Sequence, residues 1–414
     1  MEFRSTHKNN AISKYRLCFV ETSGQIGGGQ VGLIDILENL DYHIFEPWVV
    51  LTDSKSEFYR KLKSMDGVHV EVIPFTDFLP KKILENQYLA LYSPVGVLRL
   101  QKFFNWLNPA LVHSNHLGAA KYGAKAANLC AIPNLVTMRC MYYRKQFYYN
   151  RFVESRLYKN ADRVVFNSFR GAELFRERTN AKNVISIING IKLDRFSGNF
   201  DQNVFASFGI PDNKRVLLLP ARILPDKGQH LLIKALPKLI KKYPEIQVAF
   251  LGKEDHFFRG AKSDLCSLAD SLGVESFITW IDFQDDVPPF YKGAFCVVLP
   301  SYTEGCPRIL LEALASGTPI LGSKIDGINE IIEEGVNGFG FPPKDVDALA
   351  SAIEKLLILN SDQYKQMRNN CLLIARQKYD LKVMIQKYQN LYLELIHQKT
   401  KKNSKFIKTA PKNV

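Results

Sequence analysis

Short runs of β-branched and other apolar residues alternate with longer amphipathic stretches along most of the chain. This alternation is typical of βαβ units, which build parallel sheets. It occurs twice, from Tyr15 to about Lys192 and from Arg215 to about Leu357. In the first series the runs that predict strands are Arg16–Val20, Trp48–Leu51, Val68–Ile73, Leu111–His113, Asn134–Thr137, Arg163–Phe166 and Val184–Ile188. In the second series they are Val216–Pro220, Gln247–Leu251, Phe277–Trp280, Phe295–Leu299 and Pro319–Leu321.

The repeated pattern predicts an α/β protein with two doubly wound domains that face each other across a cleft, beyond the carboxyl ends of their strands. The polar, irregular stretch Gly198–Lys214 is the expected linker. Helical patterns follow over Ser361–Gln377 and Leu381–Gln398. The expected parts are a first domain over 1–195, a second domain over 196–380, a helix over 381–398 that packs back on the first domain, and a basic, disordered tail over 399–414.

The 414 residues are 46% hydrophobic and 23% charged, a composition typical of globular proteins. The longest apolar runs fall far short of the ~18–20 residues of a membrane span. The polar stretch Met1–Lys14 precedes only a brief apolar run, so we expect no signal peptide. The seven cysteines form no Cys-x-x-Cys pair and no zinc-like cluster. We therefore expect a cytoplasmic protein with reduced thiols and no metal site.

The charge is distributed unevenly. The net charge of +14 divides into +10 for residues 1–195, −2 for 196–398 and +6 for the tail. The stretch Asn86–Val153 holds eight cations and no acid, with six aromatic residues from Tyr142 to Phe152. Such a stretch suits an anionic membrane surface, a phosphorylated lipid or a nucleic acid, or it forms a solvated basic face. No zinc-finger spacing, RNA-recognition signature or basic heptad region accompanies it, so we expect no nucleic-acid partner.

A glycine-rich loop follows the first predicted strand. Its segment Gly27–Gly32 matches Gly-x-Gly-x-x-Gly and opens a predicted helix through Leu40, and Asp53 lies where a dinucleotide fold places its ribose-binding acid. A nicotinamide-dependent dehydrogenase is therefore one candidate. Against it, the match begins seven residues after Val20, whereas the fingerprint requires a tight turn directly off the strand. Glycines here also allow amides at a helix N-terminus to approach a phosphate.

Two cations, Arg222 and Lys227, follow the predicted strand Val216–Pro220. Cations five residues apart in a loop at the carboxyl end of a strand can clamp a diphosphate, the arginine through its planar fork and the lysine as a point charge. The alternative is an ordinary polar loop.

The third motif carries two carboxylates. The strand Phe295–Leu299 leads into a loop with Glu304, and then into a helix that starts near Pro307 and carries Glu312. We expect both carboxylates to reach the cleft, with the helix N-terminus between them aimed at an anion. Acids beside a phosphate suit sugar hydroxyls, because a carboxylate accepts hydrogen bonds from a vicinal diol. As helix-capping acids alone they would have no function.

Taken in order, these motifs resemble those of the retaining glycosyltransferases of family 4, which have the GT-B fold with two Rossmann-like domains. The likeness rests on Glu304 and Glu312 with seven residues between them, Arg222 with Lys227-Gly228, Asn189-Gly190, Ser316–Ile320 before Asp326–Glu330, and Gly335–Gly338. In that family the second domain binds a nucleotide-sugar and the first domain binds the acceptor.

The resemblance implies a role for individual residues. Arg222 and Lys227 would hold the diphosphate, Glu312 the ribose hydroxyls and Glu304 the donor sugar. The implied catalytic residues are Glu304, Arg222, Lys227 and His113. The implied donor-binding residues are Gly28, Gly29, Arg222, Lys227, Glu304, Gly305, Cys306, Pro307, Arg308, Ile309 and Glu312, with Gly28 and Gly29 approaching the phosphate from the acceptor side.

The chain departs from the family pattern at two positions. Cys306 stands where the family often has Phe, and Arg139 stands where several members have a His that contacts the donor sugar. We expect Arg139, Asn115 and His116 on the acceptor side. His113 is expected either to point at the cleft or to be a satisfied structural histidine.

The resemblance implies transfer of a hexose from a nucleotide-diphosphate sugar to an acceptor hydroxyl, with retention, and we expect no metal or cofactor other than the sugar nucleotide. The Asp345-Val346-Asp347 motif follows two prolines and opens a helix, so it predicts an N-cap. The basic first domain and tail predict an acceptor on a membrane-associated glycolipid, a polyprenyl-linked glycan or a lipopolysaccharide-type glycan, and a peripheral location on the cytoplasmic face of a membrane. The alternatives are a GT-B-like sugar-nucleotide epimerase or hydrolase, an NAD(P)-dependent dehydrogenase, and a noncatalytic basic binding module.

Overall fold

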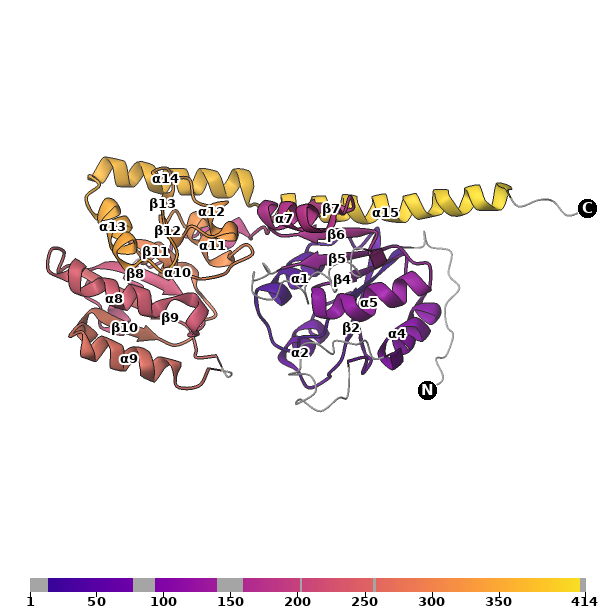
Figure 1. The fold of residues 1–414 in the computed structure, drawn as a ribbon, viewed down its shortest axis with the longest axis horizontal. Coiled ribbons are helices and arrows are strands. Elements are labelled where there is room, and N and C mark those ends of the chain that lie inside the picture. The colour runs from indigo at the N-terminus through magenta and orange to yellow at the C-terminus, as the bar shows by residue number, and fades with distance from the viewer. Residues whose placement is uncertain (1–13, 77–93, 140–158, 202, 256–257, 410–414) are drawn as a thin grey trace, which may run out of the picture.

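The computed structural model describes residues 14–76, 94–139, 159–201, 203–255 and 258–409. These residues form two parallel β-sheets with helices packed on them, which lie side by side in Figure 1. A long C-terminal helix, α15 (Leu381–Thr409, yellow), runs along the first sheet. The expected α/β class with two doubly wound domains is confirmed.

Among the described residues, the first sheet has seven strands in the order β3-β2-β1-β4-β5-β6-β7. Neighbouring strands are parallel, and the order reverses between β1 and β4, whose ends pair at Val20 and Ser114. Ligands of doubly wound sheets bind in the crevice outside such a reversal. The strands are β1 (Tyr15–Val20), β2 (Phe45–Leu51), β3 (His69–Val72), β4 (Leu111–Ser114), β5 (Asn134–Met138), β6 (Arg163–Phe166) and β7 (Val184–Ser186).

The second sheet has six strands in the order β10-β9-β8-β11-β12-β13, and its order reverses between β8 and β11. Its last strand, Gly338–Phe341, was not predicted, because alternating glycines are typical of a turn. Gly338 is required there: a Cβ would lie 1.7 Å from the carbonyl oxygen of Ile320 on the neighbouring strand. The strands are β8 (Arg215–Pro220), β9 (Ile246–Leu251), β10 (Ile278–Ile281), β11 (Cys296–Leu299), β12 (Ile320–Ser323) and β13 (Gly338–Phe341).

Helices connect the strands of both sheets. The first sheet has α1 (Gly28–Glu38), α2 (Glu57–Lys63), α4 (Pro94–Leu107), α5 (Leu117–Leu129) and α7 (Phe169–Thr179). The second has α8 (Gln229–Ile240), α9 (Ala261–Ser271), α10 (Pro288–Gly293), α11 (Arg308–Ala315), α12 (Asp326–Asn329) and α13 (Val346–Leu357). The predicted N-cap is confirmed, because the Asp345 carboxylate accepts the N–H of Ala348 at 2.9 Å.

The stretch between the two sheets is partly packed. A polar, irregular linker was expected over Gly198–Lys214, yet Phe205 and Ile210 are buried in the core of the second domain. A short 3-10 helix, η4 (Val204–Phe208), brings the Phe205 ring to 5.7 Å from that of Phe290. Isolated apolar residues in a polar stretch carry no periodicity, which is why the pattern did not predict this packing.

Two C-terminal helices follow. α14 (Ser361–Lys378) packs in the core of the second domain, whereas α15 buries Met384 and Tyr392 among residues of the first sheet such as Leu17. The sequence pattern places the end of this last helix at Gln398, but the backbone stays helical to Thr409. Residues 399–409 of the expected tail therefore continue α15, in a lysine-rich stretch that contains no Gly or Pro to break a helix, and residues 410–414 lie outside the described residues.

Within the described residues, no helix combines the length and the apolar character needed to cross a membrane. The six described cysteines are all free thiols. The aromatic residues from Tyr142 to Phe152, with the cations among them, lie outside the described residues. That part of the acid-free stretch therefore stays a prediction.

Candidate functional site

The loops with the expected donor-binding residues leave two adjacent strands. β8 and β11 pair at Leu218 and Val297, where the order of the second sheet reverses. Lys227 follows β8 and Glu304 follows β11. Because parallel strands end at the same edge of a sheet, both residues lie at the carboxyl edge.

Lys227 and Glu304 form an ion pair, with Nζ 2.5 Å from Oε1 and side chains only 20% and 12% exposed. Gly228 allows this approach: its φ of +72° suits glycine, and a Cβ would lie 2.2 Å from the carbonyl oxygen of Pro300. The two loops are also joined by their backbones, because the N–H of Tyr302 donates to the Asp226 carbonyl at 2.8 Å. The fold therefore holds Lys227, which is expected to bind the phosphate, beside Glu304, which is expected to bind the sugar.

Arg222 lies apart from this pair. Its Nη1 is 2.5 Å from Oδ2 of Asp255, and its side chain is 63% exposed. Gln229 holds the loop by donating to the Arg222 carbonyl at 2.9 Å. A diphosphate bound by Arg222 would therefore compete with Asp255.

Glu312 lies on α11 and accepts a hydrogen bond from the Tyr291 hydroxyl at 2.7 Å. Its other oxygen, Oε1, is 3.9 Å from Nε of Arg308. Burial raises the pKa of Glu312, while the Arg308 cation and the Tyr291 hydroxyl oppose the rise. Glu312 is thus a carboxylate with one oxygen occupied and the other beside a cation.

Arg308 reaches across to the first domain. Its Nη1 lies 2.9 Å from Oδ2 of Asp35 on α1 and donates to the Gly190 carbonyl at 3.2 Å. Asn189 makes a second link by donating to the Cys306 carbonyl at 3.1 Å. The structure therefore brings Arg308, expected to bind the donor, to the boundary between the domains.

The remaining donor-loop residues supply backbone and packing. A Cβ on Gly305 would lie 2.7 Å from the carbonyl oxygen of Arg139, so this loop touches the end of β5. Cys306 is buried, and burial raises the pKa of its thiol to about 12. Pro307 is the N-cap of α11, and Ile309 packs against the apolar cores. Among these four residues, only Cys306 has a polar side-chain group, its buried thiol.

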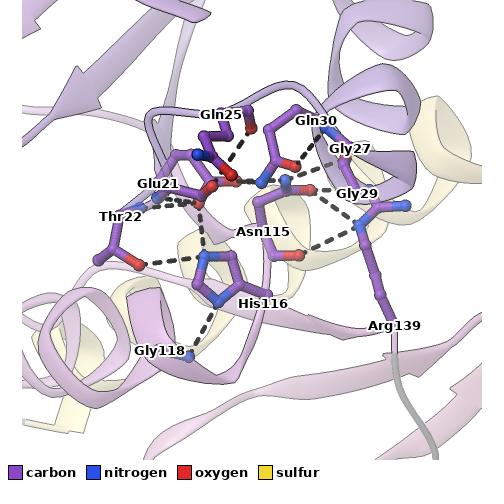
Figure 2. A network of polar contacts seen from close by, with 11 residues as sticks. Glu21, Thr22, Gln25, Gly27, Gly29, Gln30, Asn115, His116, Gly118 and Arg139 are labelled. Atoms are coloured by element: carbon purple, nitrogen blue, oxygen red, sulfur yellow. Dashed lines mark hydrogen bonds and ion pairs between the residues drawn. The ribbon is translucent and has the colours of Figure 1, made fainter. Parts of the chain in front are cut away.

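Glu21 is the centre of a hydrogen-bond network at the reversal of the first sheet (Figure 2). It directly follows β1 and is fully buried. Burial alone would raise the pKa of Glu21, but the hydrogen bonds outweigh it and lower the pKa to about 2. Oε1 accepts from the N–H groups of Thr22 (2.7 Å) and Ser23 (2.8 Å) and from Nε2 of His116 (2.5 Å), and Oε2 accepts from Asn115 (2.6 Å) and Gln30 (3.1 Å). Sequence reasoning missed Glu21, although an acid at the carboxyl end of an apolar strand was the available signal.

Asn115 links this network to Arg139 (Figure 2). Its amide nitrogen donates to the Gly29 carbonyl at 3.2 Å, and its Oδ1 accepts from Nε (3.1 Å) and Nη2 (2.7 Å) of Arg139. The guanidinium lies against α1, where a Cβ on Gly32 would come within 2.5 Å of Nη1. Gly28, by contrast, has no neighbour within 4 Å of where a Cβ would lie, so the start of the helix is open.

Both ring nitrogens of His116 are engaged within the first domain. Nδ1 accepts from the Gly118 N–H at 3.0 Å, so the proton of the neutral ring lies on Nε2, which faces Glu21 and the Thr22 hydroxyl.

The described residues contain no group of three or more His, Cys, Asp or Glu side chains that could hold a metal ion.

His113 does not point at the boundary between the domains. It is fully buried, with its nitrogens 3.0 Å from the Tyr392 hydroxyl and 2.7 Å from that of Thr137, and its ring stacks on Tyr388. Burial, with a smaller contribution from the Arg139 cation, lowers the pKa of His113 well below its usual value. Of the two alternatives expected for His113, the structure favours the satisfied structural histidine over a catalytic contact, because Tyr388 and Tyr392 of α15 pack over this side of β4.

Comparison with known proteins identifies relatives in both halves. Residues 26–195 match the family model described as Glycosyltransferase Family 4, and residues 200–372 match the one described as Glycosyl transferases group 1. An uncharacterized glycosyltransferase of Methanocaldococcus jannaschii is 33% identical over 177 residues, which cover 41% of this chain. A D-inositol 3-phosphate glycosyltransferase of a Mycobacterium species is 29% identical over 208 residues, which cover 49%. The chain spans 44% and 46% of the lengths of these two relatives.

Solved structures show the same fold. The Anabaena protein HepE in complex with UDP superposes with a TM-score of 0.79 over 92% of this chain and 100% of that chain, at 22% identity. HepE has also been solved with UDP-glucose. The two family models adjoin along the sequence and together match most of the chain. The chain therefore belongs to the family 4 glycosyltransferases of the GT-B fold.

Proposed function

We propose that this chain transfers a hexose from a nucleotide-diphosphate sugar to an acceptor hydroxyl, with retention of configuration at the anomeric carbon. One observation carries the proposal: Lys227, Glu304 and Glu312 all lie in segments that follow the two strands at the reversal of the second sheet. This combination offers a cation to a phosphate and two carboxylates to hydroxyls. The UDP-glucose bound by HepE and the name of the Mycobacterium relative support a nucleotide-sugar donor and sugar transfer.

Donor binding exchanges one anion for another. The diphosphate replaces Glu304 as the partner of Lys227 and Asp255 as the partner of Arg222. In this exchange both cations keep an anionic partner. Glu304, once released, accepts hydrogen bonds from the hydroxyls of the donor sugar, while Glu312 accepts those of the ribose.

The departing diphosphate develops negative charge, which Lys227 and Arg222 stabilise. One preorganised contact of this kind contributes ~3 kcal/mol, a rate factor of about 100 to 1,000. The acceptor oxygen bonds to the anomeric carbon on the face from which the phosphate oxygen leaves, and that phosphate oxygen takes the acceptor proton. The reaction therefore requires neither a histidine base nor, in this proposal, a metal.

The acceptor belongs to a membrane-associated glycolipid, a polyprenyl-linked glycan or a lipopolysaccharide-type glycan. The first domain carries the excess positive charge, and α4 exposes Val95 and Leu98 beside the cations Arg99 and Lys102. Apolar side chains among cations suit an anionic lipid surface, where each cation contributes ~1 kcal/mol. This surface also supports a peripheral location on the cytoplasmic face of a membrane.

Incubation with UDP-, GDP- and ADP-hexoses and a lipid-linked acceptor tests the proposal, with proton NMR to report the anomeric configuration of the product. A product with the configuration of the donor supports it, and an inverted product contradicts it. Donor consumption that needs no acceptor indicates the epimerase or hydrolase alternative. Quenching of NADH or NADPH fluorescence by the protein indicates the dehydrogenase.

A further inference from the structure

The carboxyl end of β1 carries a charge that the proposed reaction does not use. Glu21 is fully buried, and five donors from three segments of the first domain converge on its two oxygens (Figure 2). A buried carboxylate is costly unless donors satisfy it. Once it is satisfied, each charge-assisted bond fixes the orientation of its donor.

Asn115 links the Glu21 carboxylate to the Arg139 guanidinium. Its amide nitrogen faces Glu21 at 2.6 Å, so its oxygen faces the opposite way and accepts two N–H groups of Arg139. A reversed amide would put its oxygen against the Glu21 carboxylate and its N–H groups against the guanidinium, and both contacts are repulsive. Glu21 therefore decides which way Asn115 points, and Asn115 decides where Arg139 lies.

Arg139 occupies the boundary between the domains. Its side chain lies against Gly29 and Gly32 of α1, and its backbone touches Gly305 in the donor-sugar loop of the second domain. We infer that Glu21 is a positioning residue: through Asn115 it holds the Arg139 guanidinium where it contacts the sugar-phosphate end of the donor. This inference deepens the proposed function and rests on it.

Calorimetric titration of the full chain tests the inference. The probes are whichever of UDP-, GDP- and ADP-glucose binds the wild type, and the matching nucleoside monophosphate, which lacks the sugar and the second phosphate. We expect Glu21→Gln to lower the affinity for the sugar nucleotide about tenfold or more, whereas the affinity for the monophosphate should change by less than about twofold. We expect the Glu21→Gln, Arg139→Ala double variant to bind no more weakly than Arg139→Ala alone, because Glu21 acts through Arg139.

Glu46→Gln is the matched control. It makes the same chemical change in the same domain, at the amino end of β2, where Glu46 pairs with Arg16 at 3.2 Å, and it should change neither affinity. Where Glu21→Gln does not fold, Asn115→Ala interrupts the same contact while keeping the buried carboxylate, with the same expected losses.

Four results overturn the inference. Additive losses in the double variant, or an equal loss of monophosphate affinity, would assign Glu21 a purely structural role. If the wild type binds none of the three sugar nucleotides, the proposed function fails and the inference fails with it. Binding by the wild type with unchanged affinities in Glu21→Gln refutes the inference alone.

Discussion

Asp35 and Arg308 join the two domains: the carboxylate on α1 lies 2.9 Å from the guanidinium on α11. The same guanidinium lies 3.9 Å from Glu312, the proposed ribose ligand. Burial raises the pKa of Asp35, while the cations Arg308 and Lys192 oppose the rise. The pair therefore couples the arrangement of the domains to the donor site.

Replacing Asp35 by Asn keeps the size of the side chain and removes its charge. We expect kcat/KM for the donor to fall about tenfold, because Arg308 turns toward Glu312 and competes with the ribose. Steady-state kinetics against Glu38→Gln, one turn further along α1, provides the comparison, since Glu38 pairs with Lys61 and Lys192 at the surface. A kcat/KM equal to that of the wild type contradicts the coupling.

Lys227→Ala and Glu312→Ala test the donor site. Each should lower turnover about 100- to 1,000-fold, because each removes a contact to the donor. Lys238→Ala, at an exposed lysine that pairs with Asp347, should leave turnover unchanged. Treatment of the wild type with EDTA should also leave it unchanged. Wild-type turnover in either site variant, or loss with EDTA, refutes the assignment.

The stability of the protein should report the ionisation of Glu21. Its pKa is about 2 in the folded chain against an ordinary value of 4.5, so the ionised carboxylate stabilises the fold above pH 4.5, and this stabilisation is lost as the pH falls toward 2. This difference in pKa corresponds to ~3 kcal/mol in the free energy of unfolding. Urea denaturation of the wild type and Glu21→Gln should therefore give free energies of unfolding that converge by up to ~3 kcal/mol as the pH falls. A gap that is independent of pH argues against this picture.

Membrane binding should depend on the exposed face of α4. We expect co-sedimentation with phosphatidylglycerol vesicles but not with phosphatidylcholine vesicles, and a several-fold loss of binding in Leu98→Ser. Leu98 is 59% exposed, and Ile358, at the end of α13 in the second domain, is 68% exposed. Ile358→Ser is therefore the matched control and should bind as the wild type does. Equal binding to both kinds of vesicle excludes an anionic surface as the partner.

The sequence pattern predicted the features that depend on local order along the chain. Of the thirteen strands in the described part of the chain, twelve coincide with predicted apolar runs. The sequence also placed Lys227 and Glu304 near each other, because each follows a strand of the same sheet. The missed strand, Gly338–Phe341, is held by pairing with β12 rather than by its own composition.

Other features depend on contacts between distant segments. His113 is buried because Tyr388 and Tyr392, more than 270 residues further on, pack over it, and no local pattern encodes that position. Asp35 and Arg308 likewise meet only once both domains are assembled. The role of Glu21 could be predicted only with the strand order known. Its partners Asn115 and His116 follow β4, which neighbours β1 in space but not in sequence.

Thermal unfolding with UDP-, GDP- and ADP-hexoses tests the central claim most directly, with wild type and Lys227→Ala compared at equal ligand concentrations. A ligand at about 100 times its Kd stabilises a folded protein by ~2.7 kcal/mol. We predict that one nucleotide class raises the Tm of the wild type and that Lys227→Ala loses most of this rise. No rise with any sugar nucleotide, or an equal rise in Lys227→Ala, would contradict a donor site built on Lys227.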